Sequence, residues 1–503
     1  MPFIIIKDLT FGYDGSPHLF EGLNLNLDSS FKLGLIGRNG CGKTTFLKLL
    51  SGQLNYVGKI DTSERFLYFP PAVENPHLNA YELSLSLRPE SHRDYRLERE
   101  ASLLALNKTA LERPFDTLSG GEATKVLLSI LFLEENVFPL IDEPTQNLDL
   151  RGREVVKDYL SLKKGFILAS HERLLLDSCV DHILALSLTG IELVKGNFSS
   201  YMENRIRWEE FQKNEKTKLN SEIARLERAS QKSRQWAQKT EKGKYGEGPV
   251  DRGYIGHKAA KMNKRAKAVD KRRQEALEEK KALVIKNEKR VNLSLEPLKY
   301  HHEVLAYGKD LSVGYQETPN LTDLSFSIRR GEILAVKGPN GSGKSLFLKL
   351  LLGEAKIFSG EYHRAENLII SYVPQKMEVE NISLRELSQT RLVDEAQLKT
   401  ILRHLGLDRK DFEVRLSDMS LGQKKKIFLA LSLATPAHLY LWDEPMGYVD
   451  ILSRLEIEEL LVAKRPTMVV IEHDLVLLKH VATDTLDLTR HLHNRNELNE
   501  MSE

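Results

Sequence analysis

The hydrophobic positions in the middle of the chain, residues 206–290, recur at helical spacing among charged and polar neighbours. Before a glycine-containing stretch at 243–256, Leu219, Ile223 and Leu226 lie three or four residues apart. After it, every seventh residue is apolar, at Met262, Val269, Ala276 and Leu283. This spacing predicts two helices packed antiparallel on either side of a loop. At about 1.5 Å per residue, arms of about 30 to 37 residues would be about 45 to 55 Å long.

Shorter hydrophobic runs on both sides of this middle predict strands. In the first half they lie at 3–13, at 32–36 and just before Asp142. Runs of this length, bounded by turn-forming residues, are typical of buried strands. The polar residues that directly follow such strands are the first candidates for chemistry.

One of these strands leads into a glycine-rich loop, Gly37–Thr44, with a helix predicted after it at 45–50. The loop has the GxxxxGK[ST] pattern, in which backbone N–H groups surround phosphate oxygens. In that arrangement Lys43 reaches the β and γ oxygens and Thr44 holds Mg²⁺. The loop therefore predicts a nucleotide-binding site.

Further motifs in the first half complete a set for hydrolysis of a nucleoside triphosphate. Residues 118–122 read LSGGE, and Asp142 and Glu143 follow an apolar run. We expect Asp142 to bind Mg²⁺, Glu143 to polarise the attacking water and His171 to contact the γ-phosphate.

The same order of motifs recurs in the second half at a nearly constant offset. Lys43 is matched 301 residues later by Lys344, and Glu143 at the same distance by Glu444. The other second-half motifs are Gly338–Ser345, Tyr315, Gln375, Ser420–Gln423, Asp443 and His473. Such a repeat predicts two similar domains in one chain.

Together, these motifs resemble an ABC-type ATPase domain, present twice. The resemblance implies an α/β fold and a head-to-tail sandwich, in which each ATP lies between the phosphate loop of one half and the signature of the other. It implies catalytic roles for Glu143, Glu444, His171 and His473. The Mg²⁺ ligands that it implies are Thr44, Asp142, Ser345, Gln375 and Asp443. The ATP-binding residues that it implies are Tyr13, Gly37, Asn39, Gly40, Gly42, Lys43, Thr44, Thr45, Ser119, Gly120, Gly121, Tyr315, Gly338, Asn340, Gly341, Gly343, Lys344, Ser345, Gln375, Ser420, Gly422 and Gln423.

The two composite sites are unequal in sequence. Pro71 stands in YFPP where the second half has Gln375 in YVPQ, and Leu421 interrupts the second signature. Both differences fall on the site built on Lys43. Two explanations stay open, sequence drift and a division into a slow and a fast site.

Charge sets the middle of the chain apart. Residues 201–290 contain 26 Lys and Arg against 14 Asp and Glu, whereas the whole chain has 73 against 71. Concentrated basic charge predicts a polyanionic partner, because neutralised phosphates release their counterions. A solvated helical spacer between two domains is the alternative.

Two ABC domains joined by a long, basic, antiparallel α-helical hairpin resemble the ABC-F ATPases. The segments at 245–246 and 251–261, with FPLIDEPT and YLWDEP, are similar to the Lsa-type antibiotic-resistance branch. That resemblance implies binding to the exit site of the 70S ribosome, with contacts to 23S rRNA and to peptidyl or initiator tRNA. It also implies protection against lincosamides, pleuromutilins and streptogramin A. The side chains expected to contact RNA are Lys242, Lys244, Tyr245, Val250, Arg252, Tyr254, Lys258, Lys261, Lys264 and Arg265.

Composition favours a cytoplasmic chain without a membrane partner. No segment approaches about 20 uninterrupted apolar residues, and no signal peptide is recognisable. The two cysteines, Cys41 and Cys179, form no disulfide framework. Cys41 lies at the start of a predicted helix, a position that favours thiolate.

We expect a monomer with an intramolecular sandwich of the two ABC domains. The predicted domains are 1–200 and 302–490, with the basic hairpin at 201–301, its loop at about 243–256, and a polar tail at 491–503. Two other functions remain open, a housekeeping translation or DNA-repair factor of the same architecture and the ATPase subunit of a membrane transporter.

Overall fold

The structure is a computed structural model of the 503-residue chain. It describes residues 3–13, 15, 18–88, 94–134, 137–146, 148–187, 190–242, 293–315, 318–339, 341–375, 377, 381–472 and 474–491. The chain divides into two compact units, one of Met1–Tyr201 with Val291–Glu503 and one of Met202–Arg290.

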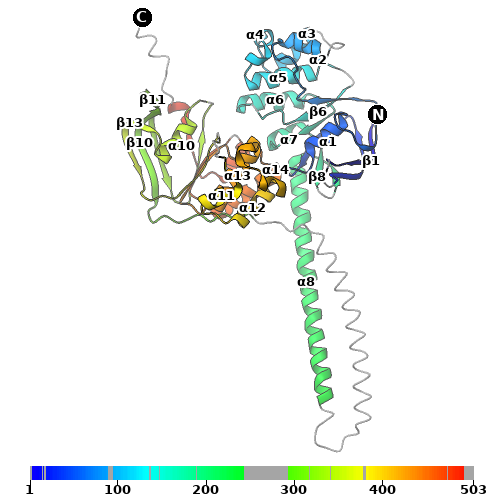
Figure 1. The fold of residues 1–503 in the computed structure, drawn as a ribbon, viewed down its shortest axis with the longest axis vertical. Coiled ribbons are helices and arrows are strands. Elements are labelled where there is room, and N and C mark those ends of the chain that lie inside the picture. Colours follow the sequence, from blue (N-terminus) through cyan, green and yellow to red (C-terminus); the bar gives the residue numbers. More distant parts are fainter. Residues whose placement is uncertain are drawn as a thin grey trace, which may run out of the picture. The chain divides into compact units, whose positions relative to one another are not determined.

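The first half is built around a sheet of six described strands in the order β5-β6-β7-β3-β8-β9 (Figure 1). All neighbours are parallel except β8 and β9. The central strands are mostly apolar, as expected where helices cover both faces of a parallel sheet. The six strands are β3 (Lys32–Gly37), β5 (Arg65–Phe69), β6 (Val137–Asp142), β7 (Phe166–Ala169), β8 (His182–Ser187) and β9 (Gly190–Lys195).

A smaller antiparallel sheet of the first half has the order β2-β1-β4. Its strands are β1 (Phe3–Phe11), β2 (Phe20–Asp28) and β4 (Val57–Asp61). The helices of this half are α1 (Lys43–Leu50), α2 (Ala80–Leu87), α3 (Asp94–Leu103), α4 (Lys108–Glu112), α5 (Gly120–Leu131), α6 (Leu150–Ser161) and α7 (Arg173–Cys179), with a 3-10 turn at Phe115–Thr117.

The second half repeats this plan. Its parallel sheet has the described order β14-β15-β16-β12-β17, and its antiparallel sheet has the order β11-β10-β13. The parallel strands are β12 (Ile333–Lys337), β14 (Ile370–Val373), β15 (Leu439–Asp443), β16 (Met468–Ile471) and β17 (Asp484–Asp487). The antiparallel strands are β10 (Val304–Tyr315), β11 (Thr318–Arg329) and β13 (Lys356–Arg364).

The helices of the second half pack on its parallel sheet around buried side chains such as Trp442 and Tyr440. They are α10 (Lys344–Leu352), α11 (Leu384–Thr390), α12 (Glu395–His404), α13 (Leu421–Ala434), α14 (Ile451–Lys464) and α15 (Leu475–Val481), with 3-10 turns at Arg409–Glu413, Leu416–Asp418 and Leu488–His491. The duplicated α/β architecture predicted from the motifs is therefore confirmed.

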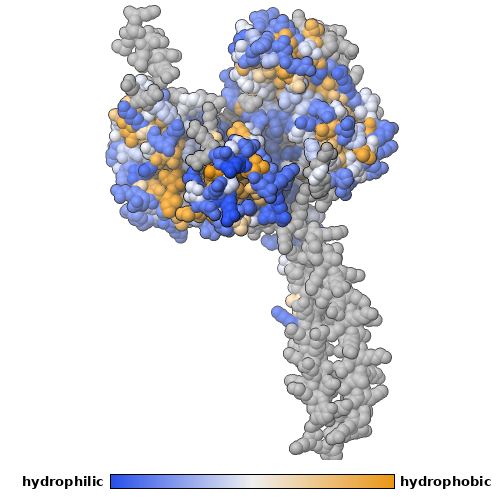
Figure 2. All heavy atoms as spheres, viewed as in Figure 1, coloured by the Kyte–Doolittle hydropathy of each residue, from blue (hydrophilic) through white to orange (hydrophobic). Residues whose placement is uncertain are grey.

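The middle of the chain begins with one long helix, α8 (Phe198–Lys242). It is the first predicted arm, and the predicted loop and second arm lie outside the described residues. Within the described ranges, no helix combines the length and the apolar character that crossing a membrane requires. Figure 2 shows hydrophilic side chains over most of the visible face of the two halves, with smaller hydrophobic patches between them.

Candidate active site

The first phosphate loop joins β3 to α1, as predicted, although the helix begins at Lys43 and not at residue 45. Gly42 precedes the helix with φ 96°, a left-handed conformation that favours glycine. The Lys43 Nζ donates hydrogen bonds to the carbonyl oxygens of Gly37, at 2.8 Å, and Arg38, at 3.3 Å. The Thr44 hydroxyl donates to Asp142 Oδ2 at 2.7 Å. The loop thus provides backbone N–H groups and the Lys43 ammonium group, next to the hydroxyl–carboxylate pair of Thr44 and Asp142.

The second phosphate loop repeats this geometry. Gly343 precedes α10 with φ 84°. Lys344 Nζ donates to the carbonyl oxygen of Gly338 at 2.8 Å, and the Ser345 hydroxyl donates to Asp443 Oδ2 at 2.8 Å. Burial raises the pKa of Asp443 and lowers that of Lys344. Asn340, a predicted ATP contact in this loop, lies outside the described residues.

The predicted catalytic glutamate of the first half lies beside the predicted switch histidine. Glu143 Oε1 is 3.3 Å from His171 Nε2. Burial and the adjacent Asp142 charge raise the pKa of Glu143 to about 8, opposed by the positive charges of Arg454 and Lys43. Burial, followed by the same two cations, lowers the pKa of His171. The pair therefore favours a neutral imidazole next to a protonated carboxyl group.

The corresponding glutamate of the second half accepts a hydrogen bond from Gln375. Gln375 Nε2 donates to Glu444 Oε1 at 2.9 Å. Glu143 and Glu444 share a left-handed backbone, with φ 48° and 51°. Non-glycine residues adopt this conformation only where the surrounding structure enforces it, often at functional sites. His473, the predicted partner of Glu444, lies outside the described residues.

Tyr68 is a site residue that the sequence did not single out. Its hydroxyl donates to Asp142 Oδ2 at 3.1 Å, and burial, followed by the Asp142 charge, raises its pKa. It lies three residues before Pro71, which occupies the place of Gln375. Tyr372 occupies the equivalent position of the second half, so a comparison of the two halves gave no reason to single out Tyr68.

The two signature segments begin helices. Ser119 caps α5 and Ser420 caps α13, each in a capping box with the residue three positions later, Glu122 or Gln423. Free N–H groups at such helix ends attract anions. Both segments are therefore suited to contact phosphate.

The structure brings the second signature close to the first site. A cavity of about 500 Å³ is lined by Asn39 and His171 of the first half and by Ser420, Gly422 and Gln423 of the second half. The Asn39 side-chain amide donates to the Tyr448 carbonyl oxygen at 2.7 Å. The first phosphate loop thus contacts the segment before α14.

The first signature does not meet the second site in the same way. A cavity of about 570 Å³ contains Tyr315, Lys344 and Gln375, with Asp149 and Gln146 of the first half. The residues that line this cavity do not include the first signature. Gly120 instead lines a cavity of about 450 Å³ that also contains Thr44, Tyr68 and Asp142.

The two tyrosines among the predicted ATP-binding residues, Tyr13 and Tyr315, lie near their phosphate loops. Tyr315 lines the second-site cavity, with Lys349 Nζ 5.1 Å from its ring centre. Tyr13 is 52% exposed, and its hydroxyl is hydrogen-bonded to that of Thr45 at 3.0 Å. Both rings are available for stacking.

The expectation that Cys41 favours thiolate was wrong. The side chain packs in the core of the first half, and burial raises the pKa of the thiol. Desolvation of the charged form outweighs the nearby Lys43 charge.

Of the predicted RNA contacts, Lys242 is the last residue of α8. The other nine lie outside the described residues, namely Lys244, Tyr245, Val250, Arg252, Tyr254, Lys258, Lys261, Lys264 and Arg265.

The sequence profile of the family described as ABC transporter matches the chain twice, at residues 20–146 and 321–447. The chain belongs to this ABC family. Each match covers a phosphate loop, a signature and a glutamate, so both halves are ABC-type ATPase domains. The prediction of ATPase domains is confirmed.

Relatives of similar length refine this placement. The chain is 27% identical to the ribosome protection protein VmlR of Bacillus subtilis (strain 168), over 93% of this chain and 83% of VmlR. It is 24% identical to the energy-dependent translational throttle protein EttA of Haemophilus influenzae, over 93% of this chain and 89% of EttA. With two ABC domains in one chain, these likenesses place it among the ABC-F ATPases.

A solved structure shares the fold. The archaeal ribosome recycling factor aABCE1, in complex with the stalk protein aP1, superimposes with a TM-score of 0.58 at 19% identity. The match covers 96% of this chain and 89% of that one. At 19% identity this likeness shows a shared fold alone.

Proposed function

We propose that this ABC-F ATPase binds the ribosome in its ATP-bound state and protects the peptidyl-transferase centre against lincosamides, pleuromutilins and streptogramin A. The observation that carries the proposal is the likeness to the ribosome protection protein VmlR over 93% of this chain. The basic middle supports it, because RNA offers the phosphates that such a surface neutralises.

The residues of both sites fit ATP with Mg²⁺. Lys43 and Lys344 lie on loops whose N–H groups suit phosphate oxygens, and Thr44 and Ser345 stand next to carboxylates as Mg²⁺ ligands would. ATP supplies the phosphoanhydride bond, and Mg²⁺ offsets the charge of its phosphates.

Glu143 and Glu444 are proposed to orient and polarise the attacking water, with His171 and His473 beside the γ-phosphate. The 3.3 Å separation of Glu143 and His171 supports this pairing in the first half. Glu143 acts as a base only in its ionised form, which the raised pKa disfavours in the nucleotide-free protein.

The test is drug susceptibility of a sensitive bacterial strain that produces the chain. The wild type should raise the inhibitory concentrations of a lincosamide and a pleuromutilin, whereas E143Q/E444Q, which retains ATP, should not. E143Q/E444Q should pellet with 70S ribosomes in ATP, because unhydrolysed nucleotide holds the closed state. Near wild-type hydrolysis by this variant would contradict the roles of the two glutamates.

Deleting residues 246–250 separates protection from binding. This variant should hydrolyse ATP and pellet with ribosomes as the wild type does, while drug protection falls. Equal loss of protection and ribosome binding would contradict a specific role for the loop.

A housekeeping translation factor is the second candidate, favoured by the likeness to the translational throttle protein EttA. It predicts ribosome binding in ATP without any change in drug susceptibility. Recovery with membranes instead of ribosomes would support a transporter subunit.

A further inference from the structure

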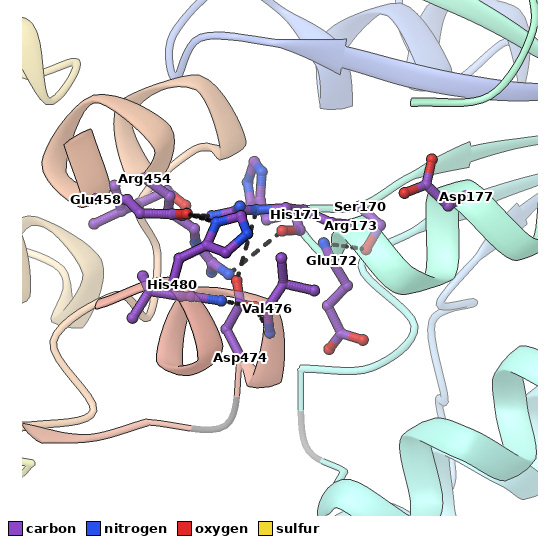
Figure 3. Close-up of polar contacts among 12 residues, drawn as sticks. Ser170, His171, Glu172, Arg173, Asp177, Arg454, Glu458, Asp474, Val476 and His480 are labelled. Atoms are coloured by element: carbon purple, nitrogen blue, oxygen red, sulfur yellow. Dashed lines mark hydrogen bonds and ion pairs between the residues drawn. The ribbon is translucent and has the colours of Figure 1, made fainter. Parts of the chain in front are cut away.

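The segment that follows the switch histidine of the first half is held by a helix of the second half. Figure 3 shows His171 and Arg173 facing Arg454, Glu458 and His480. Arg454 and Glu458 lie four residues apart on α14 and therefore share one face of that helix. The helix can thus contact the segment at two points.

The first contact reaches the histidine itself. Arg454 Nη1 donates to the His171 carbonyl oxygen at 3.4 Å, and Arg454 Nε donates to the Val449 carbonyl oxygen of its own half at 2.9 Å. The guanidinium group is thereby fixed within its own half while it contacts the other. The backbone of the switch histidine depends on this side chain from the second half.

The second contact is a buried ion pair. Arg173 Nη2 donates to Glu458 Oε2, and the side chains of both residues are 7% exposed. Glu458 Oε1 is 2.5 Å from His480 Nδ1, and Arg173 Nε is 3.9 Å from Asp474 Oδ2. Separating a buried ion pair leaves a buried charge without a partner, which is costly. The pair therefore resists separation of the two halves at this point.

The duplication shows that this contact has no counterpart on the other side. Helices α6 and α14 start after equivalent aspartates, so Lys157 corresponds to Glu458. Helices α7 and α15 start after Glu172 and Asp474, so Leu475 corresponds to Arg173. A leucine and a lysine form no ion pair.

Arg153 is the arginine equivalent to Arg454, and its Nε likewise donates to a carbonyl oxygen of its own half, that of Leu148, at 3.0 Å. Arg153 Nη1 pairs with Glu172 Oε1 of its own half at 2.7 Å. The ion pair from α14 therefore acts on the first site, and Lys157 of α6 with Leu475 of α15 cannot reproduce it.

We propose that Arg173 is a positioning residue of the first ATP site: through Glu458 it ties the His171 segment to α14 and makes this site responsive to the second half. Because His171 is 3.3 Å from Glu143, a shift of the segment moves the pair that faces the γ-phosphate. The inference rests on the proposed roles of Glu143 and His171.

The test compares R173M with K157M, the substitution at the position equivalent to Glu458. In the full chain, R173M should lower kcat for ATP by up to about twofold, the share of one of two sites, with KM changed less. K157M should leave kcat unchanged. R173K retains the charge and should restore part of the loss. Equal kcat values for R173M and K157M would overturn the proposal.

A double substitution separates positioning from stability. R173M/E458M replaces both buried ions by apolar side chains, which should restore much of the melting temperature lost in R173M. It should not restore kcat, because the tie is absent. Recovery of kcat together with melting temperature would show a merely structural pair and refute the proposal.

Hydrogen exchange tests the tie without hydrolysis. In the nucleotide-free chain, R173M and R173M/E458M should exchange faster at residues 170–176, and K157M should not. Unchanged exchange would show that the Arg173–Glu458 pair does not hold the His171 segment, whether or not Glu143 is catalytic. Faster exchange with normal hydrolysis by E143Q would instead reject the role of Glu143 and leave the tie intact.

Discussion

Glu143 combines an unusual backbone with an unusual charge state. Its φ of 48° is matched by 51° at Glu444, so the same strained turn ends both strands. The neighbours differ, since Gln375 donates to Glu444 and the equivalent position of the first half holds Pro71, which has no side-chain donor. At the scale of the residue, the two ATP sites are unequal because different side chains surround equivalent carboxyl groups.

Replacing Glu143 by glutamine should stabilise the nucleotide-free protein increasingly as the pH rises. Glutamate in the unfolded chain ionises near pH 4.5, whereas Glu143 in the fold has a pKa of about 8. The wild-type fold therefore loses stability between these values, by up to about 1.4 kcal/mol per pH unit. The melting temperature of E143Q minus that of the wild type should grow from pH 5 to pH 8, measured in EDTA.

E122Q provides a control of opposite sign. Hydrogen bonds from Ser119 lower the pKa of Glu122, so this carboxylate stabilises the fold above its unfolded pKa and the effect is lost in acid. E122Q should therefore lower the melting temperature at neutral pH and converge with the wild type as the pH falls. A pH-independent difference for E143Q would contradict the raised pKa.

The aspartates that cap two equivalent helices, α6 and α14, differ in burial. Asp149 Oδ1 caps α6 by accepting from Gly152 N at 2.8 Å. Asp450 is fully buried and accepts from Ser453 N at 2.9 Å and also from Asn39 N, in the first phosphate loop, at 3.2 Å. At the scale of the element, one capping aspartate is exposed, whereas the other is buried and joins the two halves.

D450A should therefore destabilise the protein more than D149A. Loss of a helix cap alone costs about 1 kcal/mol. D450A also leaves buried donors unpaired, which adds about 1 to 3 kcal/mol. Thermal unfolding of the two variants measures the difference, and equal melting temperatures would show that the contact with Asn39 contributes nothing.

At the scale of the whole molecule, the nucleotide sites and the surplus of basic charge lie in different parts of the chain. The ATP sites lie in the two ABC domains, and the surplus of Lys and Arg lies in residues 201–290. Under the proposed function, the basic middle of the chain binds RNA, and ATP binding and hydrolysis in the ABC domains control when it does so. Salt should therefore weaken ribosome binding without a matching effect on hydrolysis.

Reversing two charges in the middle tests this division. K264E/R265E should pellet less with ribosomes than the wild type in ATP, and its binding should depend less steeply on salt, because fewer phosphates are neutralised. ATP hydrolysis in the absence of ribosomes serves as the control and should be unchanged. An unaltered salt dependence would argue that these side chains lie away from RNA.

The sequence by itself determined the duplicated fold and the chemistry of each half. Phosphate loops, signatures and strand-terminal carboxylates are local patterns, in which a few consecutive residues specify both backbone shape and function. Their recurrence at an offset of 301 residues made the two domains evident. Lys43 and Thr44 lie where those patterns predicted.

Only the tertiary structure decided which residues from distant parts of the chain contact one another. The Tyr68 bond to Asp142, the Asn39 bond to Asp450 and the burial that raises the pKa of Cys41 join residues from separate elements. Burial and contacts across the halves depend on packing between segments far apart in the chain, and no local pattern encodes them. The ion pair of Arg173 with Glu458 joins residues 285 positions apart, so only folding brings them together.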